Sequence, residues 1–243
     1  CQIVIEAVFE DREVKAEVTR RAEAAMDADA VFASNTSTLP ITGLAEMSSR
    51  PAQFVGMHFF SPVEKMQLLE IIRGAKTSEA TIAQALDFAK RIRKTPIVVN
   101  DCPSFYANRA FAMYPYEAMT MLGEGVNPAL IENAGRMAGM PMPPLALIDE
   151  VSAELLHKAM KQLRTDQGAA YREQPQDHVL TTMVEELGRL GRKVGQGFYE
   201  YPAEGPKRLW PGLAELFPLA AQQPTLEEVR ARLMYSQSLE AAR

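Results

Sequence analysis

The first hundred residues alternate between short apolar runs and amphipathic segments, and this alternation restricts the possible folds more than any other feature. The apolar runs that we interpret as strands cover residues 2–8, 31–34, 54–60, 67–72 and 96–99. Helices are expected to start near Asp11, Pro40 and Ser78. In the first helix, Val14 and Val18 begin the stripe that we expect to be buried. Strands that alternate with helices indicate an α/β fold with an open, largely parallel sheet.

The sequence pattern becomes helical after Asp101-Cys102-Pro103. We expect helices over residues 104–122, 128–138, 145–149, 153–163, 178–187 and 225–242. An all-α domain therefore follows the α/β domain, and we place the domains at 1–101, 102–203 and 204–243. The third segment is compatible with the start of a second helical repeat, because the pattern R-A-x-x-M-Y occurs at 109–114 and again at 230–235.

Composition argues against several classes of function. Hydrophobic residues make up 47% and charged residues 23% of the chain, which is ordinary for a globular protein. The net charge of -5 implies no basic surface for nucleic acid. No apolar run approaches the roughly 20 residues that a membrane span needs. The cysteines and histidines show neither a disulfide framework nor a zinc-type spacing, so we expect a cytoplasmic protein without a bound metal.

The start of the chain is unusual. Residue 1 is Cys rather than Met, and an apolar, strand-like run begins at once. A fold rarely begins inside a central strand with no segment before it. We therefore expect these residues to be an internal part of a longer protein.

Two ionisable side chains lie inside apolar, strand-like sequence. His58 belongs to the run 54–62, and Glu70, twelve positions later, belongs to the run 68–72. Burial of an unpaired charge is costly, so the simplest expectation is that the two side chains meet. A carboxylate that hydrogen-bonds an imidazole fixes its tautomer and produces a base for protons near neutral pH. The local sequence is equally compatible with a core histidine and a glutamate at a strand edge.

Small polar side chains follow the second expected strand. Asn35 and Ser37 lie in the segment 34–38, between a strand and a helix, and open α/β sheets bind ligands at the carboxyl ends of their strands. These side chains can hold a substrate oxygen, or they can form an ordinary polar turn with a helix cap. Asn108, near the start of the helical domain, is likewise either a site residue or an ordinary interhelical amide.

These separate signals match one known arrangement. The matching pieces are 4–10 (VIEAVFE), 33–37 (ASNTS), 56–63 (GMHFFSPV), 101–105 (DCPSF), 108–109 (NR) and 195–199 (GQGFY). In these pieces and their spacing, residues 1 to about 201 resemble the L-3-hydroxyacyl-CoA dehydrogenase family. The resemblance implies the C-terminal part of a Rossmann-type nucleotide-binding domain followed by the all-α domain. The tail, through 224–229, looks like the second helical repeat of the multifunctional α-subunits of fatty-acid β-oxidation, in which an enoyl-CoA hydratase domain precedes the dehydrogenase.

The resemblance implies a role for each matching residue. His58 is the general base that removes the 3-hydroxyl proton, and Glu70 hydrogen-bonds His58 and orients it. Ser37 and Asn108 bind the substrate oxygen or help to place the nicotinamide. The positions that match cofactor contacts are Glu10, Lys15, Asn35, Ser37 and Lys193.

The resemblance also implies a cofactor, a substrate and partners. NAD takes the hydride while L-3-hydroxyacyl-CoA, an acyl-CoA thioester, is oxidised to 3-ketoacyl-CoA. The helical domain is expected to form a homodimer. The longer protein is expected to associate with a thiolase subunit.

Two departures from the family pattern limit this interpretation. Ser61 stands where many members carry Asn. The glycine-rich phosphate loop of the family would precede residue 1, and the sequence Gly195-Gln196-Gly197 does not replace it, because it does not open a helix after a strand. Without that loop the pyrophosphate has no helix N-terminus to bind, so we expect this chain by itself to bind NAD poorly or not at all.

Two alternatives remain open. The chain could be a non-catalytic part of the same fold, serving as a structural protein or as a dimerisation module. It could also belong to a different hydroxy-acid dehydrogenase, such as the 3-hydroxyisobutyrate type. Enzymes of that type use a lysine base, whereas the buried polar pair expected here is His58 with Glu70.

Overall fold

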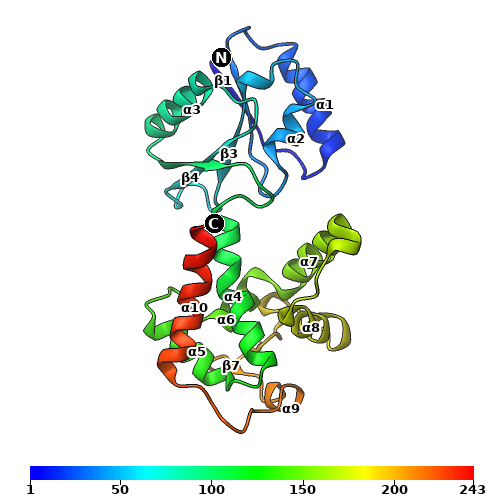
Figure 1. Cartoon of the computed structure of the whole chain (residues 1–243), viewed down its shortest axis with the longest axis vertical. Helices are drawn as coiled ribbons and strands as arrows, with labels where there is room; N and C mark the ends of the chain where they lie inside the picture. The colour runs from blue at the N-terminus through cyan, green and yellow to red at the C-terminus, as the bar shows by residue number, and fades with distance from the viewer. The chain divides into compact units, whose positions relative to one another are not determined.

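The computed structural model describes residues 1–243 except the side chain of Asp166. The described residues form two compact units, unit 1 over Cys1–Arg109 and unit 2 over Ala110–Arg243 (Figure 1). The separate third segment at 204–243 stays a prediction. Among the described residues, no helix combines the length and the apolar character that a membrane crossing requires.

Unit 1 is an open α/β sheet, as the sequence pattern predicts. Its strands, within the described residues, are β1 (Ile3–Glu6), β2 (Val31–Ser34), β3 (Phe54–Phe59), β4 (Leu68–Arg73) and β5 (Thr95–Asn100). They lie side by side in the order β1-β2-β3-β4-β5, and every pair is parallel except β3 with β4. The largely parallel α/β sheet is therefore confirmed.

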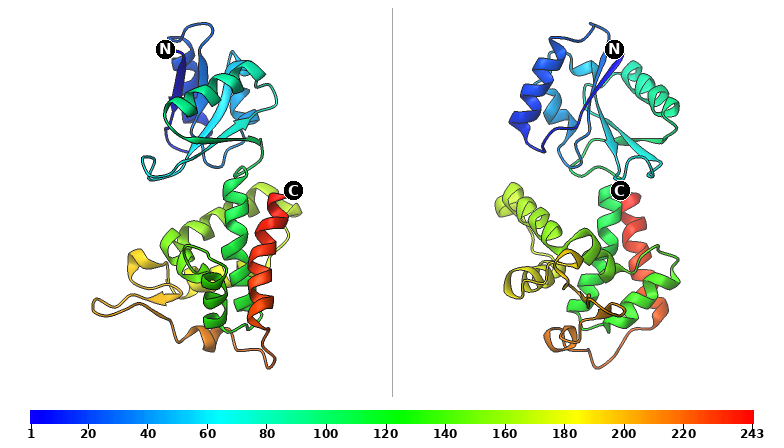
Figure 2. Two further views of the ribbon diagram at one scale, coloured as in Figure 1. Left: turned by 90° about the vertical axis from the view of Figure 1, so that its left-hand side faces the viewer. Right: turned by 180° about the vertical axis from the view of Figure 1, so that it is seen from behind.

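Helices cover both faces of this sheet. Helices α1 (Arg12–Glu23) and α2 (Ile41–Ala45) lie on one face, and α3 (Glu79–Arg91) lies on the other (Figures 1 and 2). Ile82, Ala85 and Ala89 of α3 pack into one apolar cluster with the strands. On the opposite face, Ile41 and Leu44 of α2 pack together with Phe105. A short 3-10 turn, η1 (Pro51–Gln53), leads into β3.

Two expectations for unit 1 are wrong in detail. The apolar spacing predicts that Val14 begins the buried stripe of α1, but its side chain is 42% exposed, and the buried residues are Lys15, Ala16 and Thr19. The face that turns inward is set by the buried partners of Lys15, which the apolar spacing does not reveal. The pattern also predicts a helix from residue 104, whereas α4 begins at Ala107 after a tight turn.

Unit 2 is helical, as expected. Its helices, among the described residues, are α4 (Ala107–Gly123, which begins in unit 1), α5 (Pro128–Met137), α6 (Pro144–Val151), α7 (Ala153–Gln167), α8 (Pro175–Thr181), α9 (Leu213–Leu216) and α10 (Leu226–Ala241). Shorter turns are η2 (Gly168–Ala170), η3 (Thr182–Glu186, a π-helix) and η4 (Arg192–Val194). The strands β6 (Tyr199–Glu200) and β7 (Arg208–Leu209) form a small antiparallel pair.

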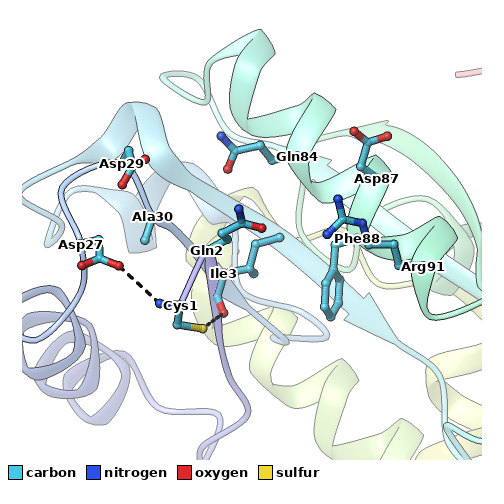
Figure 3. Close-up of a pocket in the computed structure, with 10 residues that line it drawn as sticks. All are labelled: Cys1, Gln2, Ile3, Asp27, Asp29, Ala30, Gln84, Asp87, Phe88 and Arg91. Atoms are coloured by element: carbon cyan, nitrogen blue, oxygen red, sulfur yellow. Dashed lines mark hydrogen bonds and ion pairs between the residues drawn. The ribbon is translucent and has the colours of Figure 1, made fainter.

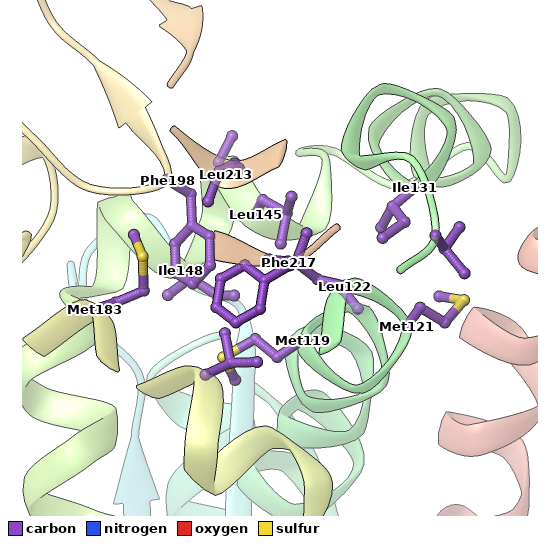
Figure 4. Close-up of a cluster of buried hydrophobic side chains, with 14 of the residues drawn as sticks. Met119, Met121, Leu122, Ile131, Leu145, Ile148, Met183, Phe198, Leu213 and Phe217 are labelled. Carbon is purple, nitrogen blue, oxygen red and sulfur yellow. The ribbon is translucent and has the colours of Figure 1, made fainter. Parts of the chain in front are cut away.

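Side chains from most of these helices meet in one apolar core. Figure 4 shows Met119 and Leu122 of α4 facing Ile148 of α6, with Phe198 and Phe217 beside them. The methionines of α4 thus fill helix interfaces, which suits their flexible, unbranched side chains. Pro115 lies inside α4 and is buried.

The segment Gly195-Gln196-Gly197-Phe198-Tyr199 is held by a buried carboxylate of unit 2. Asp149 Oδ1 accepts the amide of Phe198 at 2.8 Å, and Oδ2 accepts the amide of Tyr199 at 2.8 Å. A Cβ atom on Gly197 would lie 2.0 Å from Asp149 Oδ1. The second glycine of this segment therefore gives room for a structural carboxylate.

Candidate active site

His58 and Glu70 stand opposite each other on the antiparallel strands β3 and β4. Directly opposite residues of an antiparallel pair present their side chains on the same face of the sheet, close enough to touch. His58 Nδ1 lies 2.7 Å from Glu70 Oε2, and the two side chains are 4% and 0% exposed. The predicted contact between the imidazole and the carboxylate is confirmed.

The second oxygen of Glu70 is also bound. The amides of Tyr106 and Ala107, at the start of α4, donate to Oε1 at 3.1 and 2.7 Å. Glu70 accepts the hydrogen bonds of both amides and of the imidazole. The hydrogen of the imidazole therefore lies on Nδ1, the nitrogen that faces the carboxylate. The lone pair of Nε2 is then available, and no described residue hydrogen-bonds it. His58 is therefore oriented as a proton acceptor at Nε2.

Aromatic rings enclose the imidazole. The ring of His58 lies 4.5 Å from that of Phe60 and 5.8 Å from that of Phe105, measured between centroids. Phe105 is fully buried. These rings exclude water from the histidine–carboxylate pair, and a hydrogen bond is electrostatically stronger in such surroundings.

The loop after β2 is fixed by the carboxylate of Glu10. Its Oε1 accepts the amides of Ser37 and Thr38 at 3.0 and 3.1 Å, and the hydroxyl of Thr36 at 2.6 Å. Burial by itself would raise the pKa of Glu10, but these hydrogen bonds and the charge of Lys15 lower that pKa below its ordinary value. Glu10 thus binds the loop although its side chain is 36% exposed.

The other predicted residues of this region hold the loop from both sides. Asn108 Nδ2 donates to the carbonyl of Ser37 at 3.2 Å, and Asn35 Oδ1 accepts the amide of Phe59 at 2.9 Å. Ser37 is exposed, and no described residue hydrogen-bonds its hydroxyl. Unit 1 therefore brings Ser37, Asn108 and Asn35 together, with the hydroxyl of Ser37 available to a ligand.

Lys15 is more deeply buried than a cofactor contact requires. Its side chain is 2% exposed, and its ammonium lies 3.0 Å from Glu6 Oε1, 3.3 Å from Glu10 Oε2 and 3.3 Å from the carbonyl of Val8. An ammonium has three hydrogens to donate, so these acceptors occupy all of them. Lys15 supports Glu10 directly.

Glu6 is a buried acidic residue that the sequence does not single out as part of the site. It is 5% exposed, accepts from Lys15, and also accepts a short hydrogen bond from the hydroxyl of Ser34. A signal is present, because Glu6 interrupts an apolar strand as Glu70 does. Its basic partner nine residues later lies in a helix for which the apolar spacing predicts a different inward face.

Each helix that begins in the α/β part of unit 1 has side-chain oxygens on its first amides. Asp11 Oδ1 accepts the amides of Glu13 and Val14 at the start of α1, and Ser78 caps α3. The carboxylate of Asp101 accepts the amides of Ile41 and Thr42 at the start of α2. A pyrophosphate binds at an open helix N-terminus. The N-termini of α1, α2 and α3 are therefore not open to a pyrophosphate.

Lys193 lies in unit 2, on the exposed turn η4. Its predicted contact with the cofactor stays a prediction.

A cavity of about 520 Å³ lies at the other end of the sheet in unit 1. Figure 3 shows Asp27 and the beginning of β1 on one side of it, with Phe88 and Arg91 of α3 on the other. This cavity adjoins the amino ends of β1 and β2, whereas open α/β sheets bind ligands at the carboxyl ends. His58, and not this cavity, is therefore the candidate for the active site.

A parallel α/β sheet with an oriented histidine at the carboxyl end of a strand, followed by a helical unit, is an arrangement typical of two-domain dehydrogenases. Residues 1–102 match the NAD-binding domain of 3-hydroxyacyl-CoA dehydrogenase, and residues 105–201 match its C-terminal domain. The chain belongs to the 3-hydroxyacyl-CoA dehydrogenase family, which confirms the resemblance seen in the sequence.

Similar proteins include two named as fatty acid oxidation complex subunit alpha. The one from Shewanella baltica (strain OS185) is 42% identical over 206 residues, which are 84% of this chain and 28% of that protein. The one from Shewanella oneidensis is 42% identical over 207 residues, which are 85% of this chain and 29% of that protein. The chain thus spans less than a third of the length of these curated relatives.

Solved structures of the family are similar as well. The (S)-3-hydroxybutyryl-CoA dehydrogenase of Ralstonia eutropha is 36% identical with a TM-score of 0.74, over 83% of this chain and 71% of that one. The 3-hydroxybutyryl-CoA dehydrogenase of Escherichia coli is 31% identical with a TM-score of 0.76, over 84% of this chain and 43% of that one. Both likenesses support the two-part architecture.

Proposed function

We propose that this chain is the catalytic part of an NAD-dependent dehydrogenase that oxidises L-3-hydroxyacyl-CoA thioesters to 3-ketoacyl-CoA in fatty-acid β-oxidation. The observation that carries the proposal is the contact of 2.7 Å between His58 Nδ1 and Glu70 Oε2, which leaves Nε2 free as a base. The names of the Shewanella relatives and of the two 3-hydroxybutyryl-CoA dehydrogenases support the substrate class.

His58 is the general base of this proposal. Its Nε2 accepts the proton of the 3-hydroxyl group, and the carboxylate of Glu70 stabilises the imidazolium that forms. In the reverse direction the imidazolium returns the proton to the forming alkoxide. A positioned base of this kind contributes on the order of 10²- to 10⁴-fold to the rate.

Ser37 and Asn108 are the proposed contacts of the substrate oxygen or the nicotinamide. NAD, when bound, supplies the hydride acceptor. Asn35 and Glu10 keep the ends of β2 and β3 and the following loop in place for that ligand. Lys15 supports Glu10 from inside, and Lys193 is a further proposed cofactor contact.

Acetoacetyl-CoA reduction by NADH, assayed in the longer protein that we expect to contain this chain, tests the proposal. We expect His58→Gln to lower kcat by about 10²- to 10⁴-fold. His178→Gln is the matched control, because His178 is exposed on α8, and it should leave kcat unchanged. An unreactive longer protein, or a His58→Gln variant of full activity, would favour the non-catalytic alternative.

We also propose that this chain by itself binds NAD weakly, since side chains occupy the first amides of α1, α2 and α3. Calorimetric titration of the chain with NADH measures this directly. Binding in the micromolar range would contradict the proposal. The same titration of the longer protein is the positive control.

The proposed partners rest on the family resemblance, and the name of the Shewanella relatives, subunit alpha of a fatty acid oxidation complex, supports an assembly. We propose a homodimer through the helical unit and, for the longer protein, a thiolase subunit as partner. Tyr235 and Leu239 of α10 are 66% and 71% exposed, and such apolar side chains suit an interface. Light scattering of the purified chain would show whether it is a dimer in solution.

A further inference from the structure

The turn before α4 holds two consecutive residues in a backbone conformation that side chains disfavour. Ser104 has φ +64° and Phe105 has φ +54°, both in the left-handed region. Residues other than glycine enter this region rarely, because Cβ comes too close to the carbonyl oxygen. Such strain persists where the surrounding structure enforces it, and it concentrates at functional sites.

Several contacts within unit 1 enforce this turn. The carboxylate of Asp101 binds the amides of Ile41 and Thr42 at 2.8 and 2.7 Å, which fixes the chain before the turn. The amide of Ser104 donates to the carbonyl of Thr38 at 3.1 Å. The side chain of Phe105 is fully buried against α2 and the sheet.

The turn delivers two amides to the carboxylate of Glu70. Because Ser104 and Phe105 curl to the left, the next two amides, of Tyr106 and Ala107, point to Glu70 Oε1 at 3.1 and 2.7 Å. Glu70 is 0% exposed, so water does not compete for this oxygen. With Oε1 held, Oε2 has one orientation, and that orientation faces His58 Nδ1.

The positive end of α4 adds to the effect. The first amides of a helix carry unpaired N–H groups and a partial positive charge, and a carboxylate there is stabilised. Two amides with fixed directions restrain the rotation of the carboxyl group more tightly than one flexible side chain would. The base of the site is thus aligned by the backbone of another element.

We infer that the left-handed turn at Ser104 and Phe105 is a positioning device for His58, which acts through the amides of Tyr106 and Ala107 on Glu70. The inference rests on the proposed function of His58 as the base. Among the described residues, the side chains of Ser104 and Ala107 make no hydrogen bond with the imidazole, so their influence on it passes through the backbone.

The imidazole tautomer of His58 in the chain itself is the direct readout. Nitrogen-15 NMR separates the Nδ1–H form from the Nε2–H form, and His157→Gln and His178→Gln assign the remaining signal to His58. This measurement needs neither NAD nor substrate. A failure of the dehydrogenase assay therefore leaves it intact, and the two hypotheses can fail separately.

Two substitutions at Ser104 form a matched pair. Ser104→Val places a β-branched side chain at φ +64° and should displace the turn, whereas Ser104→Gly accepts this conformation without strain. We expect the Nδ1–H signal to persist in Ser104→Gly and to be lost in Ser104→Val. Retention of the Nδ1–H form in a folded Ser104→Val chain would count against the inference.

Ala107→Pro is an independent variant. It removes the amide that lies 2.7 Å from Glu70 at the first position of α4, where helices tolerate proline. Amide hydrogen exchange in β1 and β2 would verify that unit 1 stays folded. We expect loss of the Nδ1–H form and, in the longer protein, a lower kcat at unchanged KM. If Ala107→Pro keeps both the tautomer and kcat, the inference is overturned, whatever Ser104→Val does.

Discussion

The two units bury charged groups in different ways. In unit 1, buried ionisable side chains pair with each other. Lys15 forms an ion pair with Glu6, and the imidazole of His58 contacts the carboxylate of Glu70. In unit 2, Glu132 and Asp149 are 1% and 2% exposed, and their carboxylates accept backbone amides and tyrosine hydroxyls. In unit 1, Glu70 holds the imidazole of His58 in one orientation, and Lys15 supports Glu6 and Glu10. The carboxylates of unit 2 fasten loops to helices.

The difference also appears in the pKa values. Burial alone would raise the pKa of Glu10 in unit 1, but hydrogen bonds from Thr36, Ser37 and Thr38, with a smaller contribution from the charge of Lys15, lower that pKa. In unit 2, desolvation by burial outweighs the hydrogen bonds and raises the pKa of both Glu132 and Asp149. Glu10 is partly exposed, whereas Glu132 and Asp149 are almost completely buried, so burial makes only the latter two carboxylates costly to ionise.

The largest expected effect is that of Lys15→Met. It leaves Glu6 and Glu10 without their cation, and the removal of one partner of a buried ion pair costs about 3–5 kcal/mol. Amide hydrogen exchange in β1 and β2 should become faster, while Trp210 fluorescence, which reports on unit 2, should show unfolding at an unchanged denaturant concentration. The control is Lys158→Met, since Lys158 is exposed beside Glu154. Equal losses in both units would break the comparison.

Asp149→Ala should weaken unit 2 by about 2–4 kcal/mol, because each buried donor left unpaired costs about 1–3 kcal/mol. The amides of Phe198 and Tyr199 lose their acceptor. Urea unfolding followed by Trp210 fluorescence measures the loss. Glu150→Ala, which removes an exposed partner of Arg192, should cost under about 1 kcal/mol. A similar loss in both variants would show that Asp149 fastens nothing.

A change of pH should change the stabilities of the two units in opposite directions. The folded pKa of Glu10 lies below its ordinary value of 4.5, so its stabilisation is complete above that pH and is lost as the pH falls through the folded pKa. The folded pKa values of Glu132 and Asp149 lie above 4.5 and 3.8, so their contribution is present below those values and is lost as the pH rises through the folded pKa.

Acidification from about pH 7 to about pH 4 should therefore weaken unit 1 relative to unit 2. Burial lowers the pKa of His157 in unit 2. As the pH falls below 6.5, the ordinary pKa of histidine, this residue therefore weakens unit 2 and opposes the effect of Glu132 and Asp149. A His157→Gln chain removes that influence. Amide hydrogen exchange of β2 in unit 1 and of α6 in unit 2, measured over this pH range, compares the stabilities of the two units. Parallel pH profiles of the two units would contradict the expectation.

The smallest expected effect is that of Gly195→Ala. Gly195 has φ +79°, and a Cβ atom added there would meet nothing within 4 Å, so backbone strain alone acts, at about 1 kcal/mol. Thermal unfolding followed by Trp210 fluorescence measures it. Gly197→Ala, whose Cβ would collide with Asp149, should cost clearly more than Gly195→Ala. Equal costs would remove the distinction between a conformational glycine and a glycine that makes room for a carboxylate.

Much of the fold could be predicted from the sequence, because strand runs and helix caps are local. The strand Val31–Ser34 and the caps Asp11 and Asn127 are where the sequence places them. The contact of His58 with Glu70 was predictable for a different reason. Each residue violates an apolar pattern, and two such violations in adjacent strands have few ways to be satisfied.

Other features depended on partners distant in the chain. The ion pair of Lys15 with Glu6 sets which face of α1 is buried. Because α1 has few apolar residues, its sequence pattern does not predict that face. The amides that hold Glu70 come from Tyr106 and Ala107, and a backbone amide carries no sequence signal.

The sequence by itself determined the α/β class and the order of the strands and helices along the chain, and it made the pairing of His58 with Glu70 the simplest expectation. Hydrophobic periodicity, helix caps and charged residues inside apolar runs can be recognised in the sequence because each of them involves only a few neighbouring residues. Only the tertiary structure decided which oxygen of Glu70 faces His58 and which groups restrain the other. Hydrogen-bond direction depends on the mutual orientation of elements, and that orientation exists only once the chain has packed.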